Sequence, residues 1–456
     1  MNGITRSLIY VAGVTLAVCV AAETSVKPTA TLTPKERLRA HNAQFEKKIH
    51  EVAPGVYVGV GFAGSNSTMI VGNDGVIIVD TLPALASAEI LASAFRKISD
   101  KPVKAIIYTH GHIDHVGGAK MFARDDNPEI YARSNLSIDR VDVATSPNSR
   151  RRGMRQFGRK LKPHTERINI GAGPAVQPMK GFGQGSLEPT KPFDDERLKV
   201  TISGVDIELV EAPGETDDQL YVWLPTQKVL FTGDNFYQSF PNLYAIRGTP
   251  HRNLIPWIES LDKMSNEPAA VLVPGHTSPI VGVDEVHQAL LDYRDAIRFV
   301  HDKTKEGMDK GLTPDELVDY VKLPPHLANR SYLTEFYGRI DTAVRAVFTG
   351  SLGWFDGNPT NLSNLSPAQE ATRIAKLAGG EEALVKQLNQ ATADGDHVWV
   401  LRLADYLIAL DSHTDAATAA KIASMTALAD ETVNAPTRNY YLSVAKELRD
   451  ANMEAD

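Results

Sequence analysis

The sequence predicts an α/β domain followed by an all-α domain. Short β-branched segments alternate with turns between residues 56 and 273, and one helix-like segment, 84–98, lies among them. After about residue 285 the apolar residues recur at helical spacing. We therefore place the domain boundary near residue 295, with the α/β domain at residues 46–295 and the helical domain at residues 296–450. A chain of 456 residues is long enough for both.

The elements are expected where the apolar pattern fits a strand or a helix. The expected strands are 56–60, 68–71, 76–80, 103–108, 198–202, 206–210, 220–224, 228–232 and 270–273. The expected helices of the second domain are 285–305, 314–321, 334–348, 367–377, 381–393 and 397–410. Segments 381–411 and 414–448 resemble two helical hairpins. Residues 145–195 are rich in Arg, Gly and Pro, and we interpret this long irregular insertion as a functional lid.

The N-terminus has the features of a secretory signal peptide, residues 1–22. Arg6 precedes an apolar stretch at residues 8–20, and Ala21 and Ala22 favour cleavage after residue 22. Cleavage in front of Cys19, as in a lipoprotein, is the alternative. Removal of residues 1–22 would remove the only cysteine, which fits a periplasmic or secreted protein. Residues 23–45 are interpreted as a polar lead-in, and no later segment is long and apolar enough to anchor the mature chain in a membrane.

The composition is that of a soluble globular protein, with 43% hydrophobic and 23% charged residues. The net charge of −8 argues against nucleic acid as a partner, because a nucleic-acid-binding surface needs excess positive charge. A local basic run is interpreted either as a solvated helix face or as an attraction for an anionic substrate. It consists of Arg150, Arg151, Arg152, Arg155, Arg159, Lys160 and Lys162.

A cluster of metal-competent side chains directly follows the expected strand 103–108. His110, His112, Asp114 and His115 stand within six residues. Imidazole and carboxylate groups together suit zinc. Such density at the end of a β-branched strand predicts that these side chains diverge toward two neighbouring metal ions.

Three further polar residues follow expected strands and stand beside glycine. Glu215 lies in a Pro-Gly-Glu-Thr sequence, Asp234 in Thr-Gly-Asp and His276 in Pro-Gly-His. The C-terminal ends of strands are where open sheets present ligands. With the first cluster they give seven candidate ligands and predict a binuclear metal site.

The motif His-x-His-x-Asp-His at residues 110–115 resembles that of the metallo-β-lactamase-fold hydrolases. Within this superfamily the chain resembles the zinc-dependent alkylsulfatases, which also have glutamate at the position of Glu215, where most of the superfamily has histidine. Other segments typical of this family are 242–248 (Asn-Leu-Tyr-Ala-Ile-Arg-Gly), 337–338, 352–359, 438–442 and 445–450. The resemblance covers roughly residues 50 to 450.

The resemblance implies an αββα sandwich followed by an all-α dimerisation domain, and hence a homodimer. It also implies two Zn²⁺ ions per chain, bridged by Asp234. The ligands of one ion would be His110, His112 and Glu215, and those of the other Asp114, His115 and His276. A zinc-bridging hydroxide would then cleave an alkyl sulfate ester into an alcohol and inorganic sulfate.

Charge counting predicts that the substrate needs a cation besides the metal. Two Zn²⁺ ions, three carboxylates and a hydroxide sum to zero, so the metal cluster holds a sulfate ester only weakly. Arg247 is the candidate cation, because its planar guanidinium matches two sulfate oxygens. Asn242 and Tyr244 complete the predicted substrate-binding residues, and His251 is the candidate general acid. The remaining histidines are interpreted as structural or solvated: His41, His50, His164, His287, His301, His326, His397 and His413.

Two departures from the family pattern leave the substrate open. Asp234 stands where the family usually has glutamate, and the sequence ends at Asp456 without the sterol-carrier-like domain of larger alkylsulfatases. A hydrolase of another ester, a lactone, a lactam or a phosphoester is therefore the alternative. A non-catalytic zinc-binding oligomeric protein is a more distant one.

Overall fold

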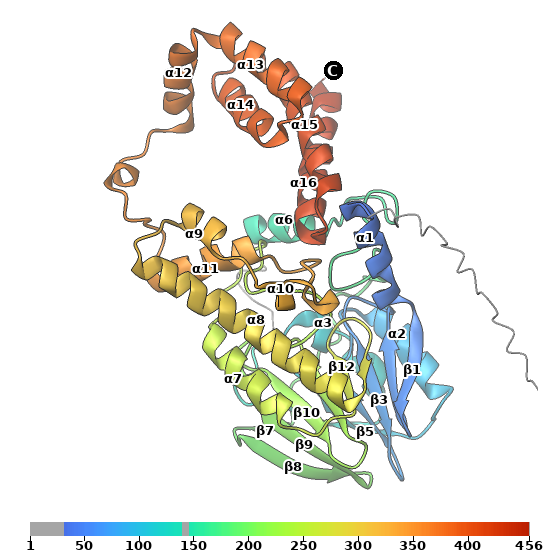
Figure 1. Ribbon diagram of the computed structural model, residues 1–456. Coiled ribbons are helices and arrows are strands. Elements are labelled where there is room, and N and C mark those ends of the chain that lie inside the picture. Colours follow the sequence, from blue (N-terminus) through green and yellow to red (C-terminus); the bar gives the residue numbers. More distant parts are fainter. Residues whose placement is uncertain (1–31, 139–145, 456) are drawn as a thin grey trace, which may run out of the picture. The chain divides into compact units, whose positions relative to one another are not determined.

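The structure is a computed structural model that describes residues 32–138 and 146–455. The predicted signal peptide, residues 1–22, lies outside the described residues. Two β-sheets face each other, and helices cover the outer face of each sheet (Figure 1). The described part of the chain contains no helix that is both long and apolar enough to span a membrane.

The first sheet has the strand order β1-β2-β3-β4-β5-β6-β7. Its strands are β1 (Lys48–Ala53), β2 (Val56–Val60), β3 (Ser67–Val71), β4 (Val76–Val79), β5 (Val103–Ile107), β6 (Glu129–Arg133) and β7 (Lys191–Phe193). The pairs from β1 to β4 are antiparallel, and those from β4 to β7 are parallel. The helices α2 (Leu85–Arg96), α3 (Ile113–Val116), α4 (Ala119–Ala123) and α6 (Pro147–Gln156) belong to the same half of the chain.

The second sheet has the order β13-β12-β11-β10-β9-β8. Its strands are β8 (Arg197–Ile202), β9 (Val205–Glu211), β10 (Leu220–Leu224), β11 (Val229–Gly233), β12 (Val271–Pro274) and β13 (Ile280–Val281). Only β11 and β12 pair in parallel within this sheet as described. The helices α7 (Leu254–Ser265) and α8 (Val283–Asp309) follow β11 and β13.

Three apolar cores hold these layers together. Between the sheets, side chains such as Val58 and Ile107 of the first sheet pack with Leu209 and Phe231 of the second. On the outer face of the first sheet, α2 and α4 bury their apolar sides. On the outer face of the second, α7 and α8 do the same, with Trp257 at the centre. Successive side chains of a strand point to opposite faces, and both faces of central strands such as β4, β10 and β11 are buried. This arrangement is an αββα sandwich, which confirms the predicted fold class.

The helical part begins with α9 (Pro314–Tyr320). It continues with α10 (Pro325–Ala328), α11 (Ile340–Leu352), α12 (Pro367–Ala378), α13 (Glu381–Asp394), α14 (His397–Ala409), α15 (Thr414–Glu431) and α16 (Ala435–Ala455). Helices α9 and α12 start with capping boxes at Thr313 and Ser366, each followed by proline. Gly379 and Gly395 end α12 and α13 in the left-handed conformation.

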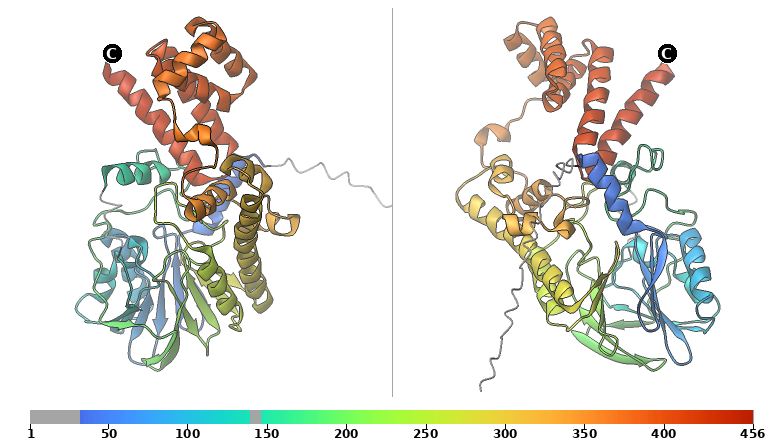
Figure 2. Two further views of the ribbon diagram at one scale, coloured as in Figure 1. Left: turned by 90° about the vertical axis from the view of Figure 1, so that its left-hand side faces the viewer. Right: turned by 45° about the vertical axis from the view of Figure 1, so that its right-hand side comes forward.

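The domain boundary predicted near residue 295 falls inside α8. This helix is continuous, because its apolar residues keep helical spacing from Val286 to Val300. Helices α9 and α11 share a core with α8 and the second sheet, through Leu317 and Val344. Helices α12 to α15, by contrast, have a core of their own. In Figure 2 these helices form one group, coloured orange to red.

Residues 34–45 of the predicted lead-in are also helical, as α1 (Pro34–Ala40) and the 3₁₀ turn His41–Phe45. Leu38 anchors this segment, because it is fully buried against Ile168, Phe336 and Ala435. The insertion at residues 145–195 is not wholly irregular, since it contains α6 and β7. The sequence did not reveal β1 and β7 because they lie at the edge of a sheet and have few buried side chains.

Candidate metal centre and adjoining cavity

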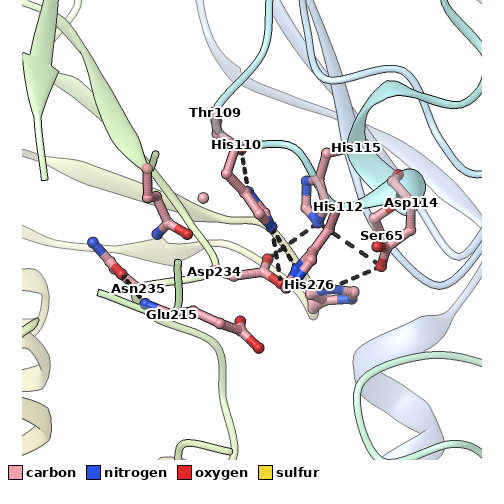
Figure 3. Close-up of polar contacts among 12 residues, drawn as sticks. Ser65, Thr109, His110, His112, Asp114, His115, Glu215, Asp234, Asn235 and His276 are labelled. Carbon is pink, nitrogen blue, oxygen red and sulfur yellow. Dashed lines mark hydrogen bonds and ion pairs between the residues drawn. The ribbon is translucent and has the colours of Figure 1, made fainter. Parts of the chain in front are cut away.

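The predicted ligands come from four loops that follow strands (Figure 3). His110 and His112 follow β5, and Asp114 and His115 lie in the short helix α3. The other three positions follow β9, β11 and β12 and are Glu215, Asp234 and His276. The two sheets therefore contribute to one site at the same end of the sandwich.

Six of the seven predicted ligands form two clusters. One potential ligand atom from each of His110, His112 and Asp234 lies within 4.8 Å of the others. The second cluster has the same property and consists of Asp114, His115 and His276. Two adjacent groups of this composition match the ligand chemistry of zinc.

The Asp234 carboxylate lies between the clusters. Its Oδ1 atom is 3.3 Å from His115 Nε2, and its Oδ2 atom is 3.2 Å from His276 Nε2 and 3.8 Å from His110 Nε2. The neighbouring Gly275 makes room for this carboxylate, because a Cβ atom there would lie 2.2 Å from Asp234 Oδ1. Asp234 thus has the position expected of a bridging ligand.

Unpaired buried atoms support a cation between these side chains. His115 Nε2, Asp234 Oδ1 and Glu215 Oε2 are buried and have no hydrogen-bond partner among the described residues. Burial of polar atoms without partners is costly, and metal ions bound at this site would satisfy these atoms. Burial also lowers the pKa values of His110 and His112 well below the ordinary value, which keeps both imidazoles neutral, as metal ligation requires.

Glu215 lies outside both clusters and pairs with Arg252. Glu215 Oε1 is 2.7 Å from Arg252 Nη2, and both side chains are buried. Burial raises the pKa of Glu215 to about 8, although Arg252 acts to lower it. Glu215 Oε2 points to no partner, so the carboxylate retains one oxygen for a metal ion. The role of Glu215 as a ligand stays a prediction.

The Asp80 carboxylate orients His115 and Thr109, and the sequence analysis does not identify it as part of the site. His115 Nδ1 donates to Asp80 Oδ2 at 2.7 Å, while Thr109 donates to both oxygens, from N at 2.9 Å and from Oγ1 at 2.8 Å. Asp80 itself has φ of 57°, a left-handed conformation that aspartate tolerates better than most residues. The available signal was an acidic residue at the end of the apolar strand β4.

A cavity of about 900 Å³ adjoins the metal-competent clusters. His112, Asp114 and Glu215 line its inner end. Much of its wall is apolar and comes from Ile113, Met154, Phe157, Ile170, Met179 and Phe182. Five of these six side chains belong to the insertion at residues 145–195, so this insertion forms a wall of the cavity.

The cavity is lined by two of the four residues predicted to bind substrate or to act as general acid. Arg247 and His251 line the cavity. Asn242 and Tyr244 are not among its lining residues. Asn242 is buried, its N–H donates to Tyr237 Oη at 2.6 Å, and its carbonyl accepts a hydrogen bond from Arg252. Asn242 therefore fixes the start of the loop that carries Arg247.

The arginines of the basic run at residues 150–162 have two different kinds of surroundings. Arg150 and Arg159 line the cavity, beside the metal-competent clusters. Burial lowers the pKa of Arg159 to about 10. Arg152 and Arg155 instead contact other parts of the protein, through Ile246 and Glu447. The run is therefore neither a purely solvated helix face nor wholly directed at a ligand.

Comparison with known proteins gives matches over most of the chain. The sequence matches the metallo-beta-lactamase superfamily over residues 60–276 and a family described as alkyl sulfatase dimerisation over residues 313–451. A linear primary-alkylsulfatase of Pseudomonas sp. (strain ATCC 19151) is 38% identical over 400 residues, which are 85% of this chain and 74% of that protein.

Two further relatives extend this similarity. An (R)-specific secondary-alkylsulfatase of Pseudomonas sp. is 31% identical over 425 residues, which are 90% of this chain and 64% of that protein. The solved structure of the stereoselective inverting sec-alkylsulfatase Pisa1 from Pseudomonas sp. superposes with a TM-score of 0.81 at 30% identity, and the match covers 91% of this chain and 67% of that one. The chain thus spans about two thirds to three quarters of the length of these relatives.

Proposed function

Because the chain belongs to the alkylsulfatase family of the metallo-β-lactamase superfamily, we propose that it hydrolyses alkyl sulfate esters to an alcohol and inorganic sulfate. One observation carries this proposal. Two metal-competent clusters, with the Asp234 carboxylate between them, adjoin a cavity that has both arginine side chains and an apolar wall. A sulfate ester with an alkyl tail has the matching combination of a negative head group and an apolar chain.

We propose that two zinc ions bind per chain. His110, His112 and Glu215 would hold one ion, and Asp114, His115 and His276 the other. Asp234 would contact both. When bound, zinc lowers the pKa of water toward neutrality and stabilises negative charge that develops on the ester.

The protein's own side chains would bind the ester and move a proton. Arg247 is expected to hold the sulfate oxygens, and Arg150 and Arg159 add positive charge along the cavity. The apolar wall would receive the alkyl chain and exclude water from it. His251 would protonate the leaving alcohol oxygen, because it lines the same cavity and rests against Gly350 of α11, where any Cβ atom would overlap its ring.

We also propose that the protein is a homodimer that works in the periplasm or outside the cell. The match of residues 313–451 to a dimerisation family supports the dimer. Large apolar side chains that are exposed in the helical part support it as well, because such side chains are commonly covered by a partner. Among them are Leu352, Trp354, Leu362 and Leu377.

The test is sulfate release from dodecyl sulfate by the purified, zinc-loaded protein, with and without a chelator. We expect chelator-sensitive release and about two zinc ions per chain, because hydrolysis needs both. Asp114→Ala should abolish the release. Full zinc loading combined with turnover of neutral esters or lactones, and no sulfate release, would instead identify a hydrolase of another ester.

A further inference from the structure

The loop that carries Arg247 is held by helix α6. Arg152 of α6 donates two hydrogen bonds to the Ile246 carbonyl, from Nε at 3.0 Å and from Nη2 at 2.6 Å. Gln156, the last residue of α6, accepts a hydrogen bond at 2.8 Å from the backbone N–H of Arg247. The Ile246 carbonyl and the Arg247 N–H belong to one peptide group. Helix α6 therefore binds both polar atoms of the peptide bond that directly precedes the Arg247 side chain.

The side chain of Arg247 also meets this segment. Its guanidinium carbon lies 5.9 Å from the centre of the Phe157 ring, a separation typical of a cation–π contact. Gly248, the next residue, has φ of 93°, and Arg152 Nη1 lies 3.6 Å from where its Cβ would stand. The backbone thus turns sharply at Gly248, directly beside Arg152.

Helix α6 is itself fixed on another side by α16. Arg155 donates to both carboxylate oxygens of Glu447, with Nη2 to Oε2 at 2.5 Å, and its guanidinium lies 5.7 Å from the Tyr440 ring centre. Ser443 Oγ adds a weak contact of 3.4 Å to the Arg155 carbonyl. Because α16 and α6 are packed together, α6 has a fixed support from which to hold the loop.

We propose that Arg152 and Gln156 are positioning residues that set the Arg247 guanidinium for an anionic head group in the cavity. This inference rests on the proposed function. The Nε and Nη2 atoms of Arg152 both donate to one carbonyl, and Arg152 is not among the residues that line the cavity, so it acts on the anion through Arg247. Gln156 is 1% exposed, which makes its hydrogen bond to the Arg247 N–H hard for water to replace.

This placement explains part of the basic run at residues 150–162. Arg150 and Arg159 line the cavity, Arg152 holds the Arg247 loop, and Arg155 holds α16. A lysine at position 152 could give the Ile246 carbonyl only a point-like donor, whereas the arginine fork gives two donors at a fixed angle. The arginine is therefore suited to fixing a loop.

The test uses dodecanesulfonate, which has the charge and tail of the substrate but no ester to hydrolyse. Its affinity for the full-length protein is measured by calorimetry for Arg152→Ala, Gln156→Met and Arg152→Lys. We expect Kd to rise roughly tenfold for the first two variants, about the loss of one hydrogen bond to a well-placed charged group. The Kd of Arg152→Lys should lie between the Kd values of these two variants and that of the wild-type protein. Arg151→Ala is the control, because it removes an exposed positive charge from the same helix.

A double-mutant cycle separates positioning from a general structural role. If Arg152 acts through Arg247, Arg152→Ala has no further effect on sulfonate binding once Arg247→Ala is present. Additive effects of the two substitutions would overturn the inference, as would unchanged affinity in both Arg152→Ala and Gln156→Met. KM for dodecyl sulfate should rise in parallel while kcat and zinc content stay unchanged. An unmodified protein that binds no sulfonate and releases no sulfate would refute the proposed function itself.

Discussion

His115 donates from Nδ1 to Asp80 Oδ2 at 2.7 Å, and this hydrogen bond directs its Nε2 atom toward Asp234. The same Asp80 carboxylate also binds Thr109, which directly precedes His110. One buried carboxylate at the end of β4 therefore fixes both the ring of one candidate ligand and the backbone that carries another.

Asp80→Ala should weaken zinc binding without removing any ligand. Loss of a carboxylate that orients a metal-bound histidine typically reduces metal affinity about 10- to 100-fold. Competition against a chromophoric chelator measures this affinity. Asp125→Ala is the control, because Asp125 is exposed on the same half of the chain. Equal zinc affinity of the two variants would show that Asp80 does not orient the site.

Arg247→Ala should impair substrate binding and leave the metal in place. Loss of hydrogen bonds between a guanidinium and an anion should raise KM for dodecyl sulfate about 10- to 100-fold. Zinc content, measured by elemental analysis, should not change. Loss of zinc from this variant would assign Arg247 a structural role instead.

Much of the candidate metal site could be predicted because its residues carry the signal locally. His110, His112, Asp114 and His115 are neighbours in the sequence, and Asp234 and His276 follow glycine at strand ends. Asp80 and Arg252 could not be predicted in this way, because each acquires its role from a partner brought near by folding. In the sequence alone, neither residue stands in a motif that distinguishes it from other aspartates or arginines.

The secondary structure likewise includes elements with a local sequence signal and elements that depend on tertiary contacts. The strands β2 and β5 and the helices α12 to α14 follow the predicted ranges closely. The strands are rich in Val and Ile, which favour β-structure, and the helices bury apolar side chains at helical spacing. For the segment of α6 the sequence leaves both an irregular insertion and a solvated helix face open, since this segment is almost entirely polar. Its helical form is supported by tertiary contacts, in particular those of Arg155 with Glu447.

Glu447→Gln should loosen α6 without changing the metal site. The Arg155–Glu447 pair is only partly buried, so its removal is expected to cost about 1 kcal/mol or less. Amide hydrogen exchange in the α6 peptide should become up to about fivefold faster, as this free energy implies. Glu431→Gln, at an exposed position in α15, is the control. Unchanged exchange in α6 would show that α16 does not support this helix.

The stability of the protein should fall in acid because of His41. This ring is 6% exposed, stacks on Phe336 with 3.9 Å between ring centres, and has its Nε2 atom 3.0 Å from the Gly171 carbonyl. Burial lowers the pKa of His41 to about 4, against 6.5 for a free side chain. The unfolded chain therefore binds more protons than the folded one between these values. The contribution is present above pH 6.5 and is lost progressively as the pH falls toward 4.

His41→Gln removes this titration but keeps a hydrogen-bond donor for the Gly171 carbonyl. Urea unfolding of both proteins without zinc, at pH 7.5 and pH 5, gives the free energy of unfolding of each. Between pH 7.5 and pH 5 the free energy of unfolding of the wild-type protein should fall by about 2 kcal/mol more than that of the variant, since each pKa unit corresponds to about 1.4 kcal/mol. Other groups titrate equally in both proteins and cancel in the difference. An equal loss in both would show that His41 does not resist protonation in the folded state.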